Sequence, residues 1–321
     1  MGLYKGSRRG ISKKKVRTTP YIIYSGTTSG VHDFLSLTAD GPPVATSSGT
    51  QASFAFAAGT WTVYFSQTMT TTVWIWGGGG GNHGRAGYSI GGGGAAGYGK
   101  YTYQFQGGST YTLVCGGGGH GDVQNGYVAS NAVGGGGKGA TLSSSGSGGG
   151  GYSGFFNTST GTPTFATALI ISGGGAGSSQ DPQYGGGGGG GNLSGGTNAS
   201  TRNGSGGTTA SGGAGGTDPT AGGNGSALLG GDGGGGAGGG GYYGGGAGSS
   251  TGPGAGGGGS GYYAGTVTLV ETFSGANGSD VRTRSYDPGG GIKQPTTAGD
   301  SGNGLGSSGY PGLIVIQRNG P

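Results

Sequence analysis

The sequence predicts an all-β fold in which long glycine segments lie between short strands. Ninety-eight of the 321 residues are glycine, and they gather in tracts instead of spreading evenly along the chain. Short apolar runs, rich in β-branched and aromatic residues, separate the tracts at residues 61–65, 71–76, 111–114, 168–171 and 313–316. A flexible glycine/serine linker does not return repeatedly to such runs. The alternation therefore indicates a folded protein built on strands.

Glycine tracts of this length have three physical explanations. Disorder is the first, because glycine loses the most backbone entropy on folding and only 29% of the chain is hydrophobic. Collagen is the second, and it fails because glycine does not recur at every third residue with proline. The third is a laterally packed bundle of polyglycine II helices, which have three residues per turn and are joined by N–H···O=C bonds and weak Cα–H···O contacts. Because the tracts keep returning to strands, we favour this bundle, inserted between strands.

The strands follow from the apolar and β-branched runs. Trp74 and Trp76 fall on one face of a predicted strand and Val73 and Ile75 on the other, so both faces should be buried. Gly107-Gly108 lies between two such runs and predicts a hairpin turn. In chain order, the predicted strands are residues 19–24, 52–57, 60–66, 71–76, 100–106, 109–115, 164–172, 262–272 and 311–317, and residues 31–38 are an ambiguous apolar stretch.

The glycine segments at residues 77–97, 116–151 and 173–261 each leave one strand and must return to the next. They must therefore run up and down beside one another, which is what a lateral bundle needs. Polar residues between the tracts suit the reversals, and they are Asn192, Asn203, Asp218, Asn224 and Asp232. The sequence thus predicts a β-sandwich with a glycine bundle standing on one end.

Charge divides the chain into an arm and a body. Residues 1–17 hold seven of the fifteen basic residues and no acid, namely Lys5, Arg8, Arg9, Lys13, Lys14, Lys15 and Arg17. A solvated tail, docking onto an acidic protein surface and contact with nucleic acid are all compatible with such an arm. We favour particle anchoring, and divide the chain into a basic anchoring arm (1–19), an attachment segment (20–51) and the β-sandwich with its bundle (52–321).

The sequence carries no pattern of an enzyme or a metal site. His32, His83 and His120 lack ligand spacing, and Glu271 is the only glutamate. The many G-x-G-x-x-G matches do not open a helix after a strand. We therefore expect no catalytic residue, cofactor or metal, and we expect Cys115 to be a small buried hydrophobe.

No targeting signal is visible either. The N-terminus has no apolar signal-peptide region, and no apolar run approaches the ~20 residues that span a membrane. We therefore expect synthesis in the cytosol and no membrane insertion.

Tyrosines within or beside the glycine tracts have two interpretations. They can cover the flanks of the bundle, or some can stand at loop tips and contact sugars or receptor loops. The predicted tips are residues 82–85, 180–184 and 217–220. Our candidate receptor contacts at these tips are His83, Arg85 and Tyr184.

Five stretches, in this order, resemble the glycine-rich domain family. They are AAGTWTVYFSQTMTTTVWIWGGGGG, GYGKYTYQFQGGSTYTLVCGGGG, ATALIISGGGAG, GGGGAGGGGYYGGGAGSSTGPGAGGGGSGYY and GYPGLIVIQRNG, and together they cover about residues 52–318. The family occurs in bacteriophage structural proteins and in the extracellular region of anaplastic-lymphoma-kinase-type receptors. The resemblance implies a tumour-necrosis-factor-like (TNF-like) β-sandwich carrying polyglycine II helices. Phage long-tail-fibre adhesins are a more distant analogy.

Two functions follow as expectations from this resemblance and from the arm. The first is a bacteriophage virion protein, made in the host cytoplasm, that acts as a tail-associated fibre or adhesin in host-surface attachment. The second is a capsid decoration, cement or head-fibre protein that clasps coat subunits through the basic arm. Expected partners are other virion proteins, a host receptor or glycan, and further copies of the chain. A secreted eukaryotic binding module is a third, weaker alternative.

Overall fold

The described part of the chain is all-β, as the sequence predicts. The computed structural model describes residues 22–24, 31–33, 53–56, 58–65, 67–84, 91–121, 132–139, 146–158, 162–179, 185–191, 194–197, 200–233, 235–250, 253–278, 284–288, 293, 297–303 and 306–319. Among these residues the only helical element is a 3-10 turn, η1 (Phe165–Thr167).

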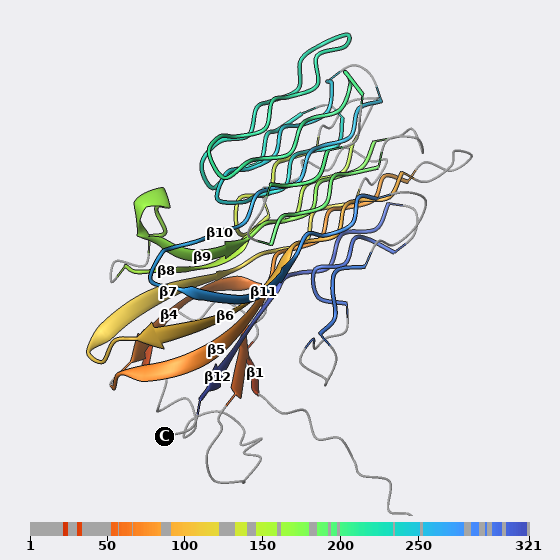
Figure 1. Cartoon of the computed structure of the whole chain (residues 1–321). Helices are drawn as coiled ribbons and strands as arrows, with labels where there is room; N and C mark the ends of the chain where they lie inside the picture. Colours follow the sequence, from red (N-terminus) through yellow and green to blue (C-terminus); the bar gives the residue numbers. More distant parts are fainter. Residues whose placement is uncertain are drawn as a thin grey trace, which may run out of the picture.

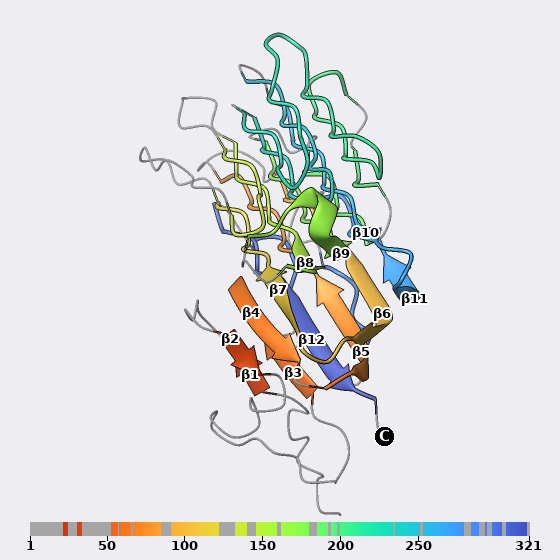
Figure 2. The ribbon, with the colours of Figure 1, turned by 90° about the vertical axis from the view of Figure 1, so that its left-hand side faces the viewer.

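The described strands form two six-stranded sheets (Figures 1 and 2). The first sheet has the spatial order β1 (Ile22–Tyr24), β3 (Ser53–Phe56), β12 (Leu313–Arg318), β5 (Met69–Trp76), β6 (Tyr98–Phe105), β11 (Thr268–Phe273). The second has the order β10 (Tyr262–Tyr263), β9 (Ala168–Ser172), β8 (Ser153–Phe156), β7 (Ser109–Cys115), β4 (Gly59–Phe65), β2 (Val31–Asp33). Neighbours are antiparallel except at β1–β3 and β2–β4, which are parallel. The longest pairing joins β5 to β6, from Met69 opposite Phe105 to Trp76 opposite Tyr98.

Side chains from both sheets build one hydrophobic core, so the sheets pack face to face like a β-sandwich. The ring of Phe65 on β4 stacks on that of Phe105 on β6, with centroids 4.1 Å apart. The core contains Trp61, Val63, Phe65, Met69, Val73, Ile75, Tyr101, Phe105, Tyr111, Leu113, Cys115, Phe155, Leu169, Ile170, Val267, Ile314 and Ile316.

Strand β5 is buried on both faces, which confirms the prediction from its sequence pattern. Val73 and Ile75 lie in the core between the sheets. Trp74 and Trp76 belong to a second cluster on the outer face of the first sheet, together with Tyr98, Ala298, Leu313 and Val315. The indole Nε1 of Trp76 donates a 2.8 Å hydrogen bond to the carbonyl oxygen of Tyr286, so the chain near Tyr286 covers this face.

Most predicted strands match observed ones within a few residues, but three places differ. Residues 262–272 form two strands in different sheets, β10 and β11, because a turn with a 2.9 Å bond from Val267 N to Ala264 O lies between them. Strand β8 was not predicted, because Ser153-Gly-Phe-Phe156 is short and carries no apolar alternation. Strand β9 begins at Ala168 instead of 164, since η1 precedes it.

The glycine segments stand on one end of the sandwich and run up and down beside one another (Figures 1 and 2). They leave the ends of β5, β7 and β9 and return to β6, β8 and β10. We call the described residues of 77–97, 116–152 and 173–261, with the segments hydrogen-bonded to them, the glycine lattice.

Hydrogen bonds in the glycine lattice repeat every three residues. Along 77–82, successive N–H groups donate to three different segments in turn. Gly77 and Gly80 donate to Gly97 and Gly94, Gly78 and Gly81 to Gly151 and Gly148, and Gly79 and Asn82 to Tyr310 and Ser307, over 2.7–3.2 Å. The carbonyls of the same segment accept bonds from still other segments, as from Gly175 N to Gly78 O and from Gly119 N to Gly79 O. A β-strand, by contrast, hydrogen-bonds on two sides only.

The segment 173–178 follows the same rule. Gly173 and Ala176 donate to Gly190 and Gly187, Gly174 and Gly177 to Gly240 and Ala237, and Gly175 and Ser178 to Gly78 and Gly81. These two segments are therefore hydrogen-bonded in several directions, and neighbouring segments approach them on all sides.

This close approach explains why glycine is required in the lattice. A Cβ added at Gly175 would fall on the carbonyl of Gly94, and one added at Gly80 on the carbonyl of Ala176. In both places the obstacle is backbone, which cannot rotate away as a side chain can. Only a hydrogen atom fits at these positions.

We expect Gly175→Ala to destabilise the protein strongly, whereas Gly265→Ala should not. Overpacking of a close-packed interior typically costs about 1–3 kcal/mol. Gly265 is the matched control, since a Cβ there meets nothing within 4 Å. Thermal and denaturant unfolding of the two variants beside the parent protein measures the difference. Equal stability of Gly175→Ala and the parent would contradict this packing.

The lone cysteine offers a second test of the core. Cys115 is fully buried at the end of β7, as predicted, and burial raises its pKa to about 12, opposed in part by a hydrogen bond from Ser153. Because the thiolate is the reactive form, the folded protein should resist alkylation well above the usual range of thiol titration. We expect labelling by a thiol reagent to begin only when the protein unfolds in denaturant. Rapid labelling of the folded protein at neutral pH would show that Cys115 is accessible.

Candidate functional site at the distal loops

The hydrogen-bond register shows which of the described loops lie at the end of the lattice away from the sandwich. Gly204 N donates to Ala255 O and Gly207 N to Gly258 O, and residues 255–260 then descend to β10. The 204 end of this segment is therefore the distal one. The chain reverses there around residues 200–203, and neighbouring segments reverse beside it around residues 217–220 and 249–250, at the end of the lattice drawn uppermost in Figure 1.

Backbone hydrogen bonds hold these reversals together. Thr217 N donates to Thr201 O at 2.8 Å, Ser249 N to Arg202 O at 2.8 Å, and Ser250 N to Thr220 O at 3.1 Å. The guanidinium Nε of Arg202 lies 3.4 Å from Asp218 Oδ2, and both side chains are substantially exposed. We call this set the distal loop surface, and it comprises Thr201, Arg202, Thr217, Asp218, Thr220 and Ser250.

The distal loop surface offers hydroxyl, guanidinium and carboxylate groups on a rigid base. Its ion pair contributes little to stability, since exposed pairs typically contribute about 0–1 kcal/mol. Loops on a rigid scaffold commonly carry recognition, because they tolerate sequence change while the scaffold stays fixed. The arrangement can donate and accept hydrogen bonds to a polar partner such as a glycan.

The prediction that His83 is an exposed receptor contact is wrong. Its exposed fraction is only 2%, because the lattice continues past the glycines through Asn82, and the backbone N–H of His83 is itself bonded to a neighbouring lattice segment. Asn82 N donates to Ser307 O at 2.9 Å, and His83 N donates to Ser178 Oγ at 2.7 Å. Polar residues after a glycine tract therefore extend the lattice here instead of turning away from it.

The other predicted site residues lie outside the described residues. These are the candidate receptor contacts Arg85 and Tyr184 and the anchoring residues Lys5, Arg8, Arg9, Lys13, Lys14, Lys15 and Arg17. The predicted tip at 217–220 is an exposed loop. Sequence reasoning missed Thr201, Arg202 and Ser250. The polar run at residues 198–203, which interrupts the glycine tracts, was the available signal for two of them.

The described tyrosines beside the glycine tracts mainly cover flanks. Tyr98 and Tyr152 are buried. The ring of Tyr242 stacks on that of Tyr262 at 3.9 Å and on that of Phe165 at 4.0 Å. Loss of solvent around this stack, with the neighbouring Tyr262, raises the pKa of Tyr242 to about 12. These contacts favour the covering role over receptor contact for this group, although Tyr263 is 36% exposed.

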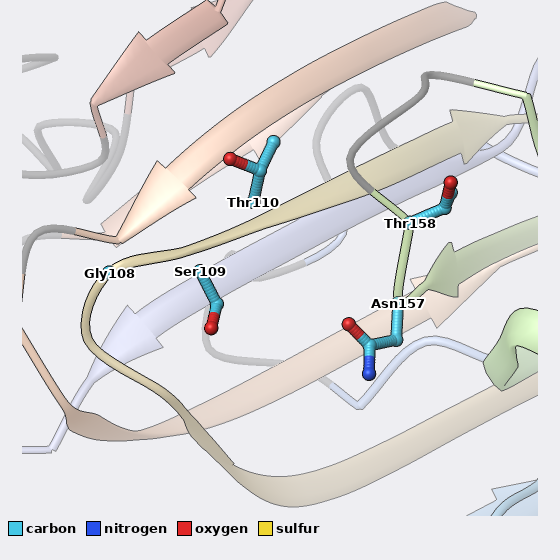
Figure 3. Close-up of a pocket in the computed structure, with 5 residues that line it drawn as sticks. All are labelled: Gly108, Ser109, Thr110, Asn157 and Thr158. Atoms are coloured by element: carbon cyan, nitrogen blue, oxygen red, sulfur yellow. The ribbon is translucent and has the colours of Figure 1, made fainter.

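A shallow hollow of about 450 Å³ lies beside the β6–β7 turn and is lined by Gly108, Ser109, Thr110, Asn157 and Thr158. In Figure 3 the side chains of Ser109 and Asn157 point one way from the backbone, and those of Thr110 and Thr158 point the opposite way. The polar side chains do not converge on one point. The hollow therefore lacks the convergent polar groups of a ligand site.

Among the described residues, the ion pair between Lys293 and Asp300 is fully buried. Lys293 Nζ lies 2.7 Å from Asp300 Oδ1 and donates to Ser285 O at 3.1 Å, and the two side chains are 2% and 0% exposed. Ser285 N also donates to Asp300 Oδ1 at 2.9 Å. Because Ser285 is bonded to both charged residues, the cluster holds the neighbouring Tyr286 against the outer face of the first sheet. We assign it a structural role.

Two further features bear on function. Within the described ranges, no group of three or more His, Cys, Asp or Glu side chains lies close enough together to hold a metal ion. The part of the chain that the structure describes also contains no apolar helix of membrane-spanning length.

Comparison with known proteins adds no relative, since neither a protein-family model nor a curated protein matches the chain. The resemblance to the glycine-rich domain family therefore stays an expectation from the quoted motifs.

We expect Lys293→Met to destabilise the protein by about 3–5 kcal/mol, because it leaves the buried Asp300 carboxylate without its cation. The double variant Lys293→Met/Asp300→Leu should recover part of this loss, since no unpaired charge then stays buried. Denaturant unfolding of both variants measures the difference. If the double variant is less stable than the single variant, the carboxylate has a role beyond pairing with Lys293.

Proposed function

We propose that the chain is a bacteriophage virion protein, made in the host cytoplasm, that acts as a tail-associated fibre or adhesin in host-surface attachment. The observation that carries this proposal is that the start of the described chain and the distal loop surface lie at opposite ends of the molecule. Strand β1, the first described element, and the end of β12 lie at the end of the sandwich opposite the glycine lattice (Figures 1 and 2). The distal loop surface lies at the far end of that lattice.

In this arrangement, attachment to the particle and recognition of the host use opposite ends of the molecule. An anchor at residues 1–19 would precede the first strand of the sandwich. Within the attachment segment 20–51, β1 and β2 pair with β3 and β4 and so add one edge strand to each sheet. The distal loops are then free to meet a host receptor or glycan. Their hydroxyl and charged groups suit a polar partner.

We further propose that the lattice segments are polyglycine II helices and that the sandwich is TNF-like. The three-residue hydrogen-bond period supports the first assignment, because polyproline II-type helices have three residues per turn. The two face-to-face sheets support a sandwich, and the TNF-like topology rests on the resemblance of the quoted motifs.

The alternative is a capsid decoration, cement or head-fibre protein. The arm favours it, since seven positive charges in residues 1–17 suit a clasp on acidic coat subunits. In this case the sandwich and arm carry the function and the distal loops bind no receptor.

Distal substitutions separate the two proposals. We expect Arg202→Ala/Asp218→Ala and Thr217→Ala/Thr220→Ala to reduce phage adsorption. Exposed substitutions usually change stability by no more than about 0.5 kcal/mol, so misfolding should not explain the defect. The measurement is the adsorption rate of particles carrying each variant, beside the melting temperature of the purified protein.

The control is Val270→Ser on β11, a side chain that is 51% exposed and outside the distal loop surface. It should leave adsorption unchanged. Normal adsorption of the distal variants, together with heat-fragile particles when the protein is deleted, would replace the adhesin proposal by the decoration protein.

A further inference from the structure

Asparagine side chains close the glycine lattice at several points. In each case Asn Oδ1 accepts a bond from a backbone N–H, in place of a backbone carbonyl. The donors are Gly93 N to Asn82, Ala255 N to Asn203, Gly215 N to Asn224 and Gly188 N to Asn277, over 2.7–2.9 Å. The asparagine amide thus continues the lattice where the backbone turns away.

Three of these asparagines precede glycine, which makes them chemically vulnerable. In an Asn-Gly pair the glycine nitrogen loses its proton to solvent and attacks the asparagine Cγ. A C–N bond forms, the Cγ–Nδ2 bond breaks, and ammonia leaves a succinimide ring. Water then opens the ring to aspartate or isoaspartate. Glycine favours this reaction because its missing side chain leaves the backbone free to reach the attacking geometry.

In all three pairs the attacking glycine nitrogen is already engaged in the lattice. Gly204 N donates to Ala255 O at 2.9 Å, Gly225 N to Gly213 O at 2.8 Å, and Gly278 N to Gly186 O at 2.8 Å. In the Asn224-Gly225 pair, the glycine N–H donates to the carbonyl of residue 213 and the asparagine Oδ1 accepts from the N–H of residue 215. The Asn277-Gly278 pair bonds residues 186 and 188 in the same arrangement. In the Asn203-Gly204 pair, the Gly204 N–H donates to the Ala255 carbonyl, and Asn203 Oδ1 accepts from the Ala255 N–H.

We propose that Asn203, Asn224 and Asn277 are latent deamidation sites that the intact lattice holds unreactive. Attack requires the glycine nitrogen to leave its carbonyl acceptor and the side chain to leave its N–H donor. The bond to Oδ1 polarises the amide and by itself would favour attack. It cannot do so while the nucleophile is held by a separate acceptor.

Burial alone does not account for this protection. Asn203 is buried, but Asn224 and Asn277 are exposed. Water therefore reaches two of the three amides, and it is the held geometry that must prevent reaction. The consequence of failure is local: isoaspartate inserts an extra backbone carbon and would break the three-residue register at that point.

Peptide mapping after prolonged incubation in mildly alkaline buffer tests the proposal. The folded protein and the same protein in urea are compared, so that each Asn-Gly pair is its own control. Conversion at Asn203, Asn224 and Asn277 should be at least about tenfold slower in the folded protein, which corresponds to ~1.4 kcal/mol of opening free energy. Equal rates in the folded and unfolded protein at these asparagines would overturn the proposal.

A local variant sharpens the test. A Cβ at Gly212 would fall on the carbonyl of Gly225, so Gly212→Val should open the lattice beside Asn224 and accelerate its conversion. The matched control Gly265→Ala, where a Cβ meets nothing within 4 Å, should leave all three sites slow. If Gly212→Val converts at Asn224 no faster than the parent, while its melting temperature falls, the lattice contact does not protect the site.

Discussion

The structure depends on the requirement that every buried backbone N–H finds a carbonyl. In a segment with three residues per repeat, successive N–H groups point in three directions, so each segment needs several neighbours at once. Residues 77–82 meet this requirement with partners around 94–97, 148–151 and 307–310. Partners on all sides leave no room for Cβ, which is why the tracts are glycine and why they occur only where the chain passes repeatedly beside itself.

The sandwich supplies the burial of apolar side chains that the glycine lattice lacks. Glycine buries no side chain, and a typical backbone hydrogen bond contributes only about 0.5–1.5 kcal/mol net, against a large entropy of ordering. The hydrophobic contribution therefore comes from the strands, through core residues such as Trp61, Phe105 and Ile314. The strands also fix where each glycine segment starts and ends, as at Trp76 and Cys115. Because the strands set these ends, neighbouring segments enter the lattice in register.

The sequence predicts most of the strands, because their side chains decide them; the short strand β8 is missed. The apolar residues on both faces of β5 predict its two buried faces, and Gly107-Gly108 predicts the β6–β7 turn. It fails where the backbone decides. His83 looks like a loop residue because it is polar, yet it is buried in the lattice, where its backbone N–H donates to Ser178 Oγ. Of the candidate site, the loop at 217–220 was predictable from its polar residues, but its proximity to Arg202 follows only from the register of the segments.

The edges of the lattice decide where a partner can bind. A glycine segment at a flank has free backbone groups that could pair with another chain, as an edge strand can. Here side chains occupy several of them: Thr197 Oγ1 accepts from Gly206 N at 2.6 Å, and Ser205 Oγ accepts from Ala214 N at 2.7 Å. Aromatic rings around Tyr242 cover another flank. Where side chains occupy the flanks in this way, the side chains of the distal reversals remain exposed, and the recognition proposed above rests on them.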